Sequence, residues 1–205
     1  MSHERFYLNT AIDRLWHVVH AIGVLLLVLS GFNIHFAESF NVLGTMERAV
    51  RWHNVVGVVV CIDWGVWLLY NLFSSRIRFY VPGRDELPEG VLRQVGFYAQ
   101  GIFRGEPHPF PATPARKFNP IQKWAYLAVM FIVMPFQIVT GAFLLWTVTN
   151  AERLGEEAMF LLSVSHTIAA FFTAVFLIAH VYLATTGAKP STYFRLMVSG
   201  WHEPD

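Results

Sequence analysis

Four long runs of apolar residues dominate the hydrophobic pattern of this chain. They cover roughly Leu15–Phe36, Trp52–Leu72, Trp124–Trp146 and Met159–Thr185. Each run has about 20 residues or more, which is the length that a helix needs to cross a bilayer core of about 30 Å. The pattern predicts an all-α integral membrane four-helix bundle, built as a single domain over residues 1–205.

The connection between the second and third runs, residues 73–123, is much longer than the other two. In its middle, apolar residues recur at helical spacing from Val91 to Phe103, and polar residues occupy the opposite side: Arg93, Gln94, Gln100 and Arg104. This pattern predicts an interfacial amphipathic helix that lies on the membrane surface. Four prolines exclude regular helix from the segment that follows, Gly105–Pro114.

The composition agrees with a membrane protein and limits its chemistry. Hydrophobic residues make up 55% and charged residues 14% of the chain, whereas soluble domains have about 25% charged residues. The single cysteine, Cys61, excludes an internal disulfide, a CxxCH attachment and a cysteine-ligated iron–sulfur cluster within this chain. Haem or metal ligands must therefore be histidine or methionine.

Lysine and arginine are distributed unevenly between the two sides of the predicted bundle. Twelve of them, Arg84 included, lie in the N-terminal segment, the long connection and the tail, and three lie on the other side: Arg48, Arg51 and Arg153. Cytoplasmic segments carry the excess of positive residues. We therefore expect a multi-pass protein of a bacterial-type inner membrane, with both termini cytoplasmic.

Two histidines of the last apolar run, His166 and His180, are fourteen residues apart. On an α-helix this spacing is a rise of about 21 Å and a rotation to within roughly 40° of the starting direction. Both imidazoles therefore point to nearly the same side, one near each membrane face. Histidines inside a membrane are costly and normally face the bundle interior. Two stacked b-type haems, each with one ligand from this helix, explain the spacing.

Two earlier histidines lie at matching depths. His17 begins the first run on the cytoplasmic side, at the depth of His180, and His53 begins the second run on the outer side, at the depth of His166. This arrangement predicts one haem near each face, with the irons about 20 Å apart along the bundle axis. His20, one turn deeper than His17, is an alternative ligand by spacing. Two axial imidazoles leave no open position on the iron and favour electron transfer.

Short motifs surround these histidines: Asp13-Arg14-x-x-His17, Leu29-Ser30-Gly31, Arg51-x-His53-x-x-x-Gly57, Lys117-Phe118-Asn119-Pro120-x-Gln122-Lys123, Thr140-Gly141 and the His166/His180 pair. With them, nearly the whole chain resembles the di-haem cytochrome b subunits of thiosulfate reductases, formate dehydrogenases (γ subunit) and nickel–iron hydrogenases. The resemblance is closest to the thiosulfate-reductase-type branch. It implies the same ligand pairs as the depths do, and it implies a quinone site beside the inner haem.

Near these ligands, Asn119 and Gly57 have two interpretations each, and Gln122 has one. Asn119 and Gln122 match polar residues of the quinone site that the resemblance implies, and Asn119 is also placed to cap the helix that Pro120 starts. Gly57, one turn after His53, either lets a porphyrin approach the backbone or makes an ordinary small-residue helix contact.

Three other ionisable residues lie outside these motifs: Asp63, His108 and His202. Asp63 lies about 15 Å along the second run from His53. It is either a proton-handling acid near the inner haem or a neutral acid that packs in the interior. His108 in the proline-rich segment and His202 in the tail are expected to face solvent.

These features predict a membrane-anchoring subunit that transfers electrons between a quinone pool, menaquinone or ubiquinone, and an extracytoplasmic oxidoreductase. The expected partner is an iron–sulfur, molybdopterin or multihaem cytochrome c subunit, and the remaining contacts are with lipid, not with nucleic acid. Whether the chain itself catalyses quinol oxidation or quinone reduction is left open. The alternative function is a free-standing transmembrane b-type reductase that uses a small soluble electron donor or acceptor.

Overall fold

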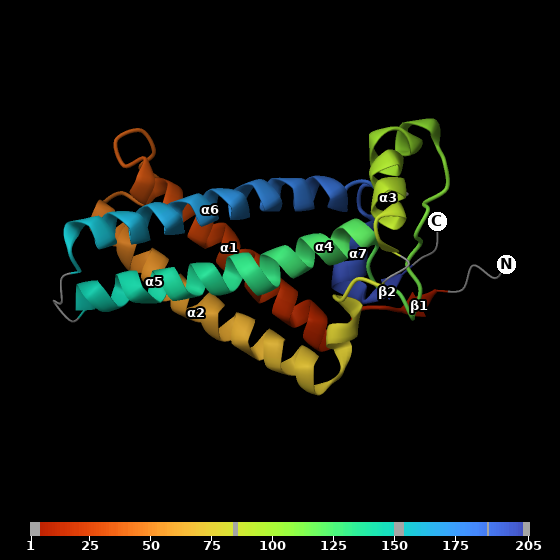
Figure 1. Cartoon of the computed structure of the whole chain (residues 1–205), viewed down its shortest axis with the longest axis horizontal. Helices are drawn as coiled ribbons and strands as arrows, with labels where there is room; N and C mark the ends of the chain where they lie inside the picture. Colours follow the sequence, from red (N-terminus) through yellow and green to blue (C-terminus); the bar gives the residue numbers. More distant parts are fainter. Residues whose placement is uncertain (1–4, 84–85, 150–153, 188, 203–205) are drawn as a thin grey trace.

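The computed structural model describes residues 5–83, 86–149, 154–187 and 189–202. Arg84 and Arg153, which were counted in the charge asymmetry, lie outside this part of the chain. Within it, four membrane-length segments run along the long axis of the molecule (Figure 1): α1 (Ala11–His35), α2 (Met46–Phe73), α4 and α5 (Pro120–Ala128 and Met134–Thr149), and α6 (Glu156–Ala184). The predicted all-α membrane bundle is confirmed.

The third span is continuous although it contains two α-helices. A five-residue π-helix, Val129–Val133, joins α4 to α5 without a break in the apolar segment. Such π segments are uncommon and often occur at functional sites. Trp64 of α2 donates through its Nε1 to the carbonyl oxygen of Met130 in this segment, at 2.9 Å. The span is thus tied to α2 at the π-helix.

All four spans begin before the apolar runs that predicted them, and in three of them a polar side chain caps the start of the helix. Thr10 accepts a hydrogen bond from the backbone N–H of Asp13 at the start of α1. Thr45 does the same for α2, and Asn119 does so for α4. These side chains satisfy backbone donors that a helix start leaves without partners. The apolar pattern marks only the part of each helix that lies in the hydrocarbon region.

The helices pack as two pairs, α1 with α2 and α5 with α6. The buried apolar residues that hold the bundle together come mainly from α2, the connection after it and the π-helix: Val56, Val60, Trp67, Tyr80, Met130 and Met134. The outward faces are also apolar, since Ile178 and Phe172 of α6 are 72% and 66% exposed. Apolar residues that cover the outside of the bundle are expected where lipid is the solvent.

The short elements gather at one end of the bundle (Figure 1). They are the short 3₁₀ segments Arg76–Phe79 and Gly101–Arg104, the helices α3 (Glu89–Ala99) and α7 (Thr192–Ser199), and the antiparallel strands β1 (Phe6–Tyr7) and β2 (Trp201–His202). Because β1 pairs with β2, the first and last described segments lie together at this end. We call it the α3 end.

Helix α3 is present as predicted, and Arg93, Gln100 and Arg104 of the predicted polar side are exposed. Gln94, which was placed on the same polar side, is instead fully buried. Leu92 and Val95 of the predicted apolar side are 67% and 48% exposed. Gln94 turns inward because the proline-rich segment folds back over α3 and brings His108 to it.

The two histidines expected in solvent are both in contact with protein. His108 is half-buried, and its ring lies 4.8 Å from the ring of Phe97. His202 is 8% exposed, and its ring lies 5.0 Å from that of Phe6. The expectation was wrong for His202 because the β1–β2 pairing, which the apolar pattern does not reveal, covers it.

Candidate functional site

The four histidines that the sequence paired by depth form two facing pairs. The rings of His17 on α1 and His180 on α6 have their centres 6.2 Å apart, with 46° between their planes. The rings of His53 on α2 and His166 on α6 have their centres 6.3 Å apart, with 76° between their planes. Helix α6 therefore contributes one ring to each pair, at two positions fourteen residues apart.

Both pairs have the separation that axial ligation of one iron requires. A metal–imidazole bond is about 2.0 Å long and a ring nitrogen lies about 1.1 Å from the ring centre, so two axial rings have centres about 6.2 Å apart. Within the described residues, no group of three or more His, Cys, Asp or Glu side chains is placed to hold a metal ion. A structural zinc needs four protein ligands. A haem iron takes only its two axial ligands from the protein, which is the number that each facing pair supplies. The residues fit haem.

The pair His53–His166, which we call the outer pair after its predicted position, is oriented by two hydroxyl groups. Ser30 of α1 donates to the carbonyl oxygen of Leu26, so its Oγ is left to accept the Nδ1 proton of His53 at 3.0 Å. Thr140 of α5 donates to the carbonyl oxygen of Phe136, and its Oγ1 lies 2.8 Å from Nδ1 of His166. A proton held on Nδ1 leaves Nε2 free for a metal, and such contacts orient metal-binding imidazoles.

A glycine follows each of these hydroxyl residues and makes room for the same ring. A Cβ atom added at Gly31 would lie 3.6 Å from Cε1 of His53, and one added at Gly141 would lie 3.1 Å from Cε1 of His166. Both dipeptides belong to the motifs that surround the histidines, but this role did not follow from the sequence. The repeated Ser/Thr-Gly pattern was the signal that could have identified them.

Gly57 faces the first span. A Cβ added there would lie 3.9 Å from the side chain of Leu27 on α1, an ordinary contact distance. This agrees with the small-residue helix contact, and the close approach of a porphyrin at Gly57 stays a prediction.

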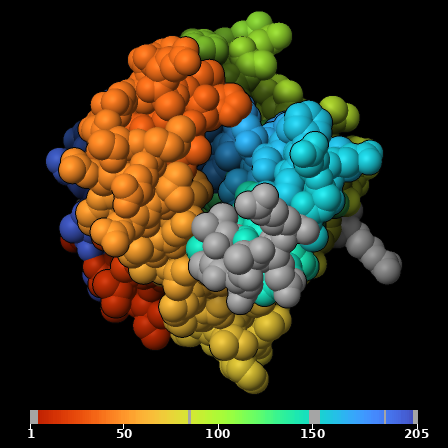
Figure 2. Space-filling model, turned by 90° about the vertical axis from the view of Figure 1, so that its left-hand side faces the viewer, coloured from red at the N-terminus to blue at the C-terminus, as the bar shows by residue number. Residues whose placement is uncertain are grey.

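The two helices that carry the outer pair stand apart at their end of the bundle. Figure 2 shows a recess between the orange segment, which includes the start of α2, and the cyan start of α6. His53 lies in the second turn of α2, and His166 lies near the middle of the outer half of α6. The recess agrees with space for a flat group between these helices.

Aromatic rings surround the pair His17–His180, which we call the inner pair after its predicted position. Phe176 stacks on His180 with ring centres 5.6 Å apart and planes at 25°. Tyr126 of α4 lies 6.3 Å from His180, and Trp16 lies 6.3 Å from His17. Flat apolar rings at this depth form walls that suit a macrocycle and keep water away from it.

The structure brings His17, and not His20, opposite His180. The Nδ1 atom of His20 lies 2.9 Å from Oδ2 of Asp63 on α2, and its ring stacks on Trp16 at 4.9 Å. Asp63 is therefore a partner of His20 in the interior. The alternative ligand by spacing is thus held away from the facing pair by an acid on the neighbouring helix.

One turn before His17, Asp13 connects three segments at the α3 end. Its Oδ2 accepts from Nη2 of Arg76 at 2.6 Å and from Nζ of Lys117 at 3.1 Å. Burial lowers the pKa of Lys117, while the negative charge of Asp13 acts in the opposite direction. Because all three side chains are largely buried, this ion cluster fixes the start of α1, and with it His17, against the long connection.

The two polar residues proposed for the quinone site form a reciprocal helix cap. The Oδ1 of Asn119 accepts from the backbone N–H of Gln122 at 2.9 Å, and the Oε1 of Gln122 accepts from the backbone N–H of Asn119 at 3.0 Å. The capping interpretation of Asn119 is thus correct. Its Nδ2 remains, and it donates to the hydroxyl of Tyr98 on α3 at 3.1 Å.

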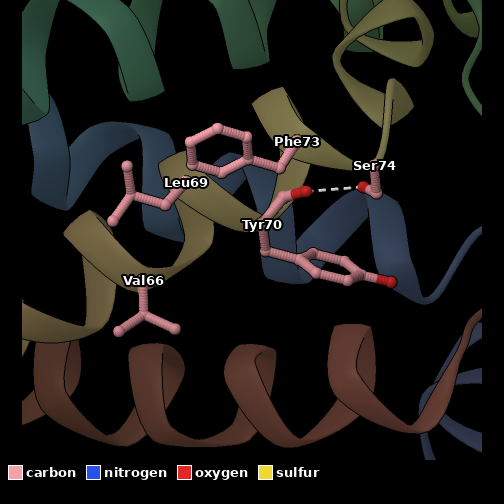
Figure 3. Close-up of a pocket in the computed structure, with 5 residues that line it drawn as sticks. All are labelled: Val66, Leu69, Tyr70, Phe73 and Ser74. Atoms are coloured by element: carbon pink, nitrogen blue, oxygen red, sulfur yellow. Dashed lines mark hydrogen bonds between the residues drawn. The ribbon is translucent and has the colours of Figure 1, made fainter.

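Two surface grooves lie away from these residues. The larger, of about 470 Å³, is lined by Val66, Leu69, Tyr70, Phe73 and Ser74 at the C-terminal end of α2 (Figure 3). The other, of about 400 Å³, is lined by Asn54, Val55, Val58, Val59 and Leu145. Both are mainly apolar and contain none of the candidate site residues. We therefore assign them to the lipid-facing surface.

The chain is similar to known proteins over most of its length. Residues 10–200 match the family model described as prokaryotic cytochrome b561. The chain is also 35% identical over 201 residues to a protein of Escherichia coli (strain K12) that carries the name cytochrome YdhU, with 97% of this chain and 75% of that protein covered.

Proposed function

The chain belongs to the prokaryotic cytochrome b561 family of membrane electron-transfer proteins, and from that premise we propose that it is a di-haem subunit linking a quinone pool to an extracytoplasmic oxidoreductase. The family implies b-type haem. The observation that carries the count of two is the presence of two facing histidine pairs, with ring centres 6.2 Å and 6.3 Å apart, at different depths of one bundle.

Each pair has one role in this proposal. His17 and His180 hold the haem nearer the α3 end, and His53 and His166 hold the other. When bound, b haems supply one-electron carriers at two depths of the membrane. The protein fixes the ring orientations through Ser30 and Thr140 on the outer side and through packed aromatic rings on the inner side.

The quinone reacts at the α3 end, beside the cap formed by Asn119 and Gln122. Tyr126 supports this location: it lies seven residues after Asn119, on the same face of the helix and about 10 Å along it, and its ring contacts that of His180. Most arginine and lysine residues belong to segments at this end, which supports a cytoplasmic side by the positive-inside rule. Quinol protons are therefore released to, or taken from, the cytoplasm.

The opposite end of the bundle faces the partner. An iron–sulfur, molybdopterin or multihaem cytochrome c subunit supplies the substrate chemistry there, because the single cysteine of this chain excludes a cysteine-ligated cluster of its own. Two protons exchanged on one side and two electrons carried to the other make the reaction electrogenic. Its sign is set by the direction of electron flow.

Haem content and spectrum test the di-haem assignment. The purified chain should give a dithionite-reduced spectrum with a b-type α band and a pyridine haemochrome ratio of two haems per chain. Replacing His53 by alanine should leave one haem, as should replacing His180. A ratio of one in the unmodified protein would overturn the count, and the absence of the α band would overturn the function.

Co-purification from native membranes tests the partner. Mild-detergent extracts should contain the chain with a molybdenum, iron–sulfur or c-type cytochrome subunit, identified by mass spectrometry of the intact complex. A chain that migrates alone, yet is reduced by a small soluble donor, would support a free-standing reductase instead.

A further inference from the structure

Besides the two hydroxyl groups, a carboxamide reaches the outer pair. Gln137 of α5 lies one turn before Gly141, and its side chain packs against the backbone of α6. Its nitrogen donates to the carbonyl oxygen of His166 at 3.2 Å, and its oxygen accepts from the backbone N–H of Ala170 at 2.9 Å. The same nitrogen lies 3.0 Å from Nδ1 of His166. The carboxamide therefore spans the turn of α6 that begins at this histidine.

The two backbone contacts fix which end of the carboxamide faces the ring. A carbonyl oxygen only accepts, so the His166 carbonyl requires the nitrogen of Gln137, and the N–H of Ala170 requires its oxygen. The opposite arrangement would bring two acceptors together at His166 and two donors together at Ala170. Because the amide nitrogen carries two protons, one serves the carbonyl oxygen and the other faces Nδ1. The positive end of the amide dipole thus lies at this ring nitrogen.

The other half of the outer site has the same local geometry without the amide. Ser30 and Thr140 each donate to the carbonyl oxygens three and four residues before them. The residue three before Thr140 is Gln137, and the residue three before Ser30 is Leu27. Leu27 packs against α2 one turn after the histidine, at Gly57, as Gln137 packs against α6 one turn after its own histidine. Leucine has no polar side-chain atom, so the two rings of the outer pair receive unequal contacts.

We propose that Gln137 is a positioning residue that opposes Thr140 at Nδ1 of His166 and raises the midpoint potential of the haem held by the outer pair. This inference rests on the di-haem function proposed above. Thr140 accepts from Nδ1 and makes the ring a stronger ligand for oxidised iron. The Gln137 amide places positive charge density at the same nitrogen, which weakens the ring as an electron donor and favours reduced iron.

The position of Gln137 argues for a functional role. Polar groups inside a membrane are costly, and α1 shows that leucine fits the equivalent place between the helices. A glutamine there needs partners, which the backbone of α6 supplies. The result is that the outer haem holds an electron more tightly than it would with leucine at position 137. This favours movement of electrons from the inner haem towards the outer one.

Redox titration of the haem-loaded, full-length protein in detergent tests the proposal. Gln137→Met keeps the length of the side chain and removes the amide. One of the two midpoints should shift downward, and the other should stay unchanged. The shifted midpoint should be the one that is missing in His53→Ala, which loses the outer haem. Thr140→Val should move the same midpoint in the opposite direction.

The matched control is Leu27→Met. It places the same new side chain at the equivalent position of α1 and removes no polar atom, so both midpoints should stay unchanged. The haemochrome ratio should remain two in this variant and in Gln137→Met. If Gln137→Met does not retain two haems, Gln137→Leu, which copies the equivalent position, decides the question. Loss of the amide contacts to α6 should lower thermal stability, but a stability loss alone does not move a single midpoint.

The outcomes distinguish this inference from the function on which it rests. If Gln137→Met and Gln137→Leu keep both midpoints of the unmodified protein, Gln137 only ties α5 to α6, the inference is wrong and the di-haem function stands. An upward shift would mean that the oxygen end of the carboxamide faces Nδ1, and it would also overturn the inference. If the unmodified protein itself binds one haem and shows one midpoint, the di-haem function is wrong.

Discussion

The hydroxyl oxygen of Thr140 lies 2.8 Å from Nδ1 of His166. Because Thr140 gives its own proton to the carbonyl oxygen of Phe136, it acts as the acceptor for the ring. Ser30 makes the equivalent contact to His53 from the other side of the site. Helices α1 and α5, which are distant in the chain, thus make the same hydroxyl–Nδ1 hydrogen bond to the two rings of one pair.

Removing the Thr140 hydroxyl should weaken the outer haem site and raise its midpoint potential. An imidazole that donates its Nδ1 proton is a stronger ligand for oxidised iron, and loss of such a partner typically costs 10- to 100-fold in metal affinity. Redox titration of Thr140→Val and of Ser30→Ala should show one of two midpoints shifted upward. Thr173→Ala is the control, because that buried hydroxyl bonds only to the backbone of its own helix. Unchanged potentials in both variants would contradict the assignment.

The two site glycines should respond differently to a methyl group. An added Cβ at Gly141 would lie 3.1 Å from Cε1 of His166, which is too close unless the ring moves, whereas at Gly31 the distance to His53 would be an ordinary 3.6 Å. We expect Gly141→Ala to lower the haemochrome ratio from two towards one and Gly31→Ala to keep it at two. Alanine is otherwise favoured in a helix by about 1 kcal/mol, so a loss at Gly141 reports the contact and not the helix. Equal haemochrome ratios in Gly141→Ala and Gly31→Ala would refute the contact between position 141 and the His166 ring.

Substitutions of His17 and of His20 should differ in their effect on haem content. His17→Gln should lose the haem nearer the α3 end, because its ring faces His180. His20→Gln should keep both haems, since glutamine can still bond to Asp63. His20→Leu should also keep both haems but lower the free energy of unfolding by about 1–3 kcal/mol, because Asp63 is left without its partner. Haemochrome assays and thermal unfolding in detergent check the three variants, and haem loss in His20→Gln would reverse the assignment.

The spans and the histidine pairs could be predicted because both depend on regular helix geometry. Apolar runs of membrane length locate the spans, and the fixed rise of a helix puts His166 and His180 at different depths on one side. Spacing alone could not choose between His17 and His20. That choice depends on Asp63, which lies on another helix and draws His20 towards itself.

What could not be predicted depends on contacts between segments that lack periodicity. Gln94 was assigned to the outward face because its polarity suggested solvent, yet the proline-rich segment covers it and supplies His108 as a partner. His202 is buried by a two-residue strand pair that joins the first and last described segments. In both cases a long-range contact decides the burial of a polar residue, and no local pattern records such a contact.

Tyr80 should make the stability of the protein fall at alkaline pH. It lies in the connection after α2, where burial raises its pKa from 10.0 to about 12 and Trp67 donates to its hydroxyl. Above pH 10 the unfolded chain releases the phenol proton while the folded chain still holds it, so the unfolded state binds fewer protons. Unfolding therefore becomes easier as the pH rises from 10 to 12.

Replacing Tyr80 by phenylalanine removes this dependence. The difference in unfolding free energy between the unmodified protein and Tyr80→Phe should be constant below about pH 9 and then fall by roughly 1–3 kcal/mol as the pH rises, since one pKa unit corresponds to 1.36 kcal/mol. Thermal unfolding in detergent, followed by circular dichroism across this range, measures the difference. Tyr7→Phe, at an exposed tyrosine, should show no such fall. A difference for Tyr80→Phe that stays flat to pH 12 would mean that the phenol ionises equally easily in the folded and unfolded chains, and the burial of Tyr80 would then not govern its titration.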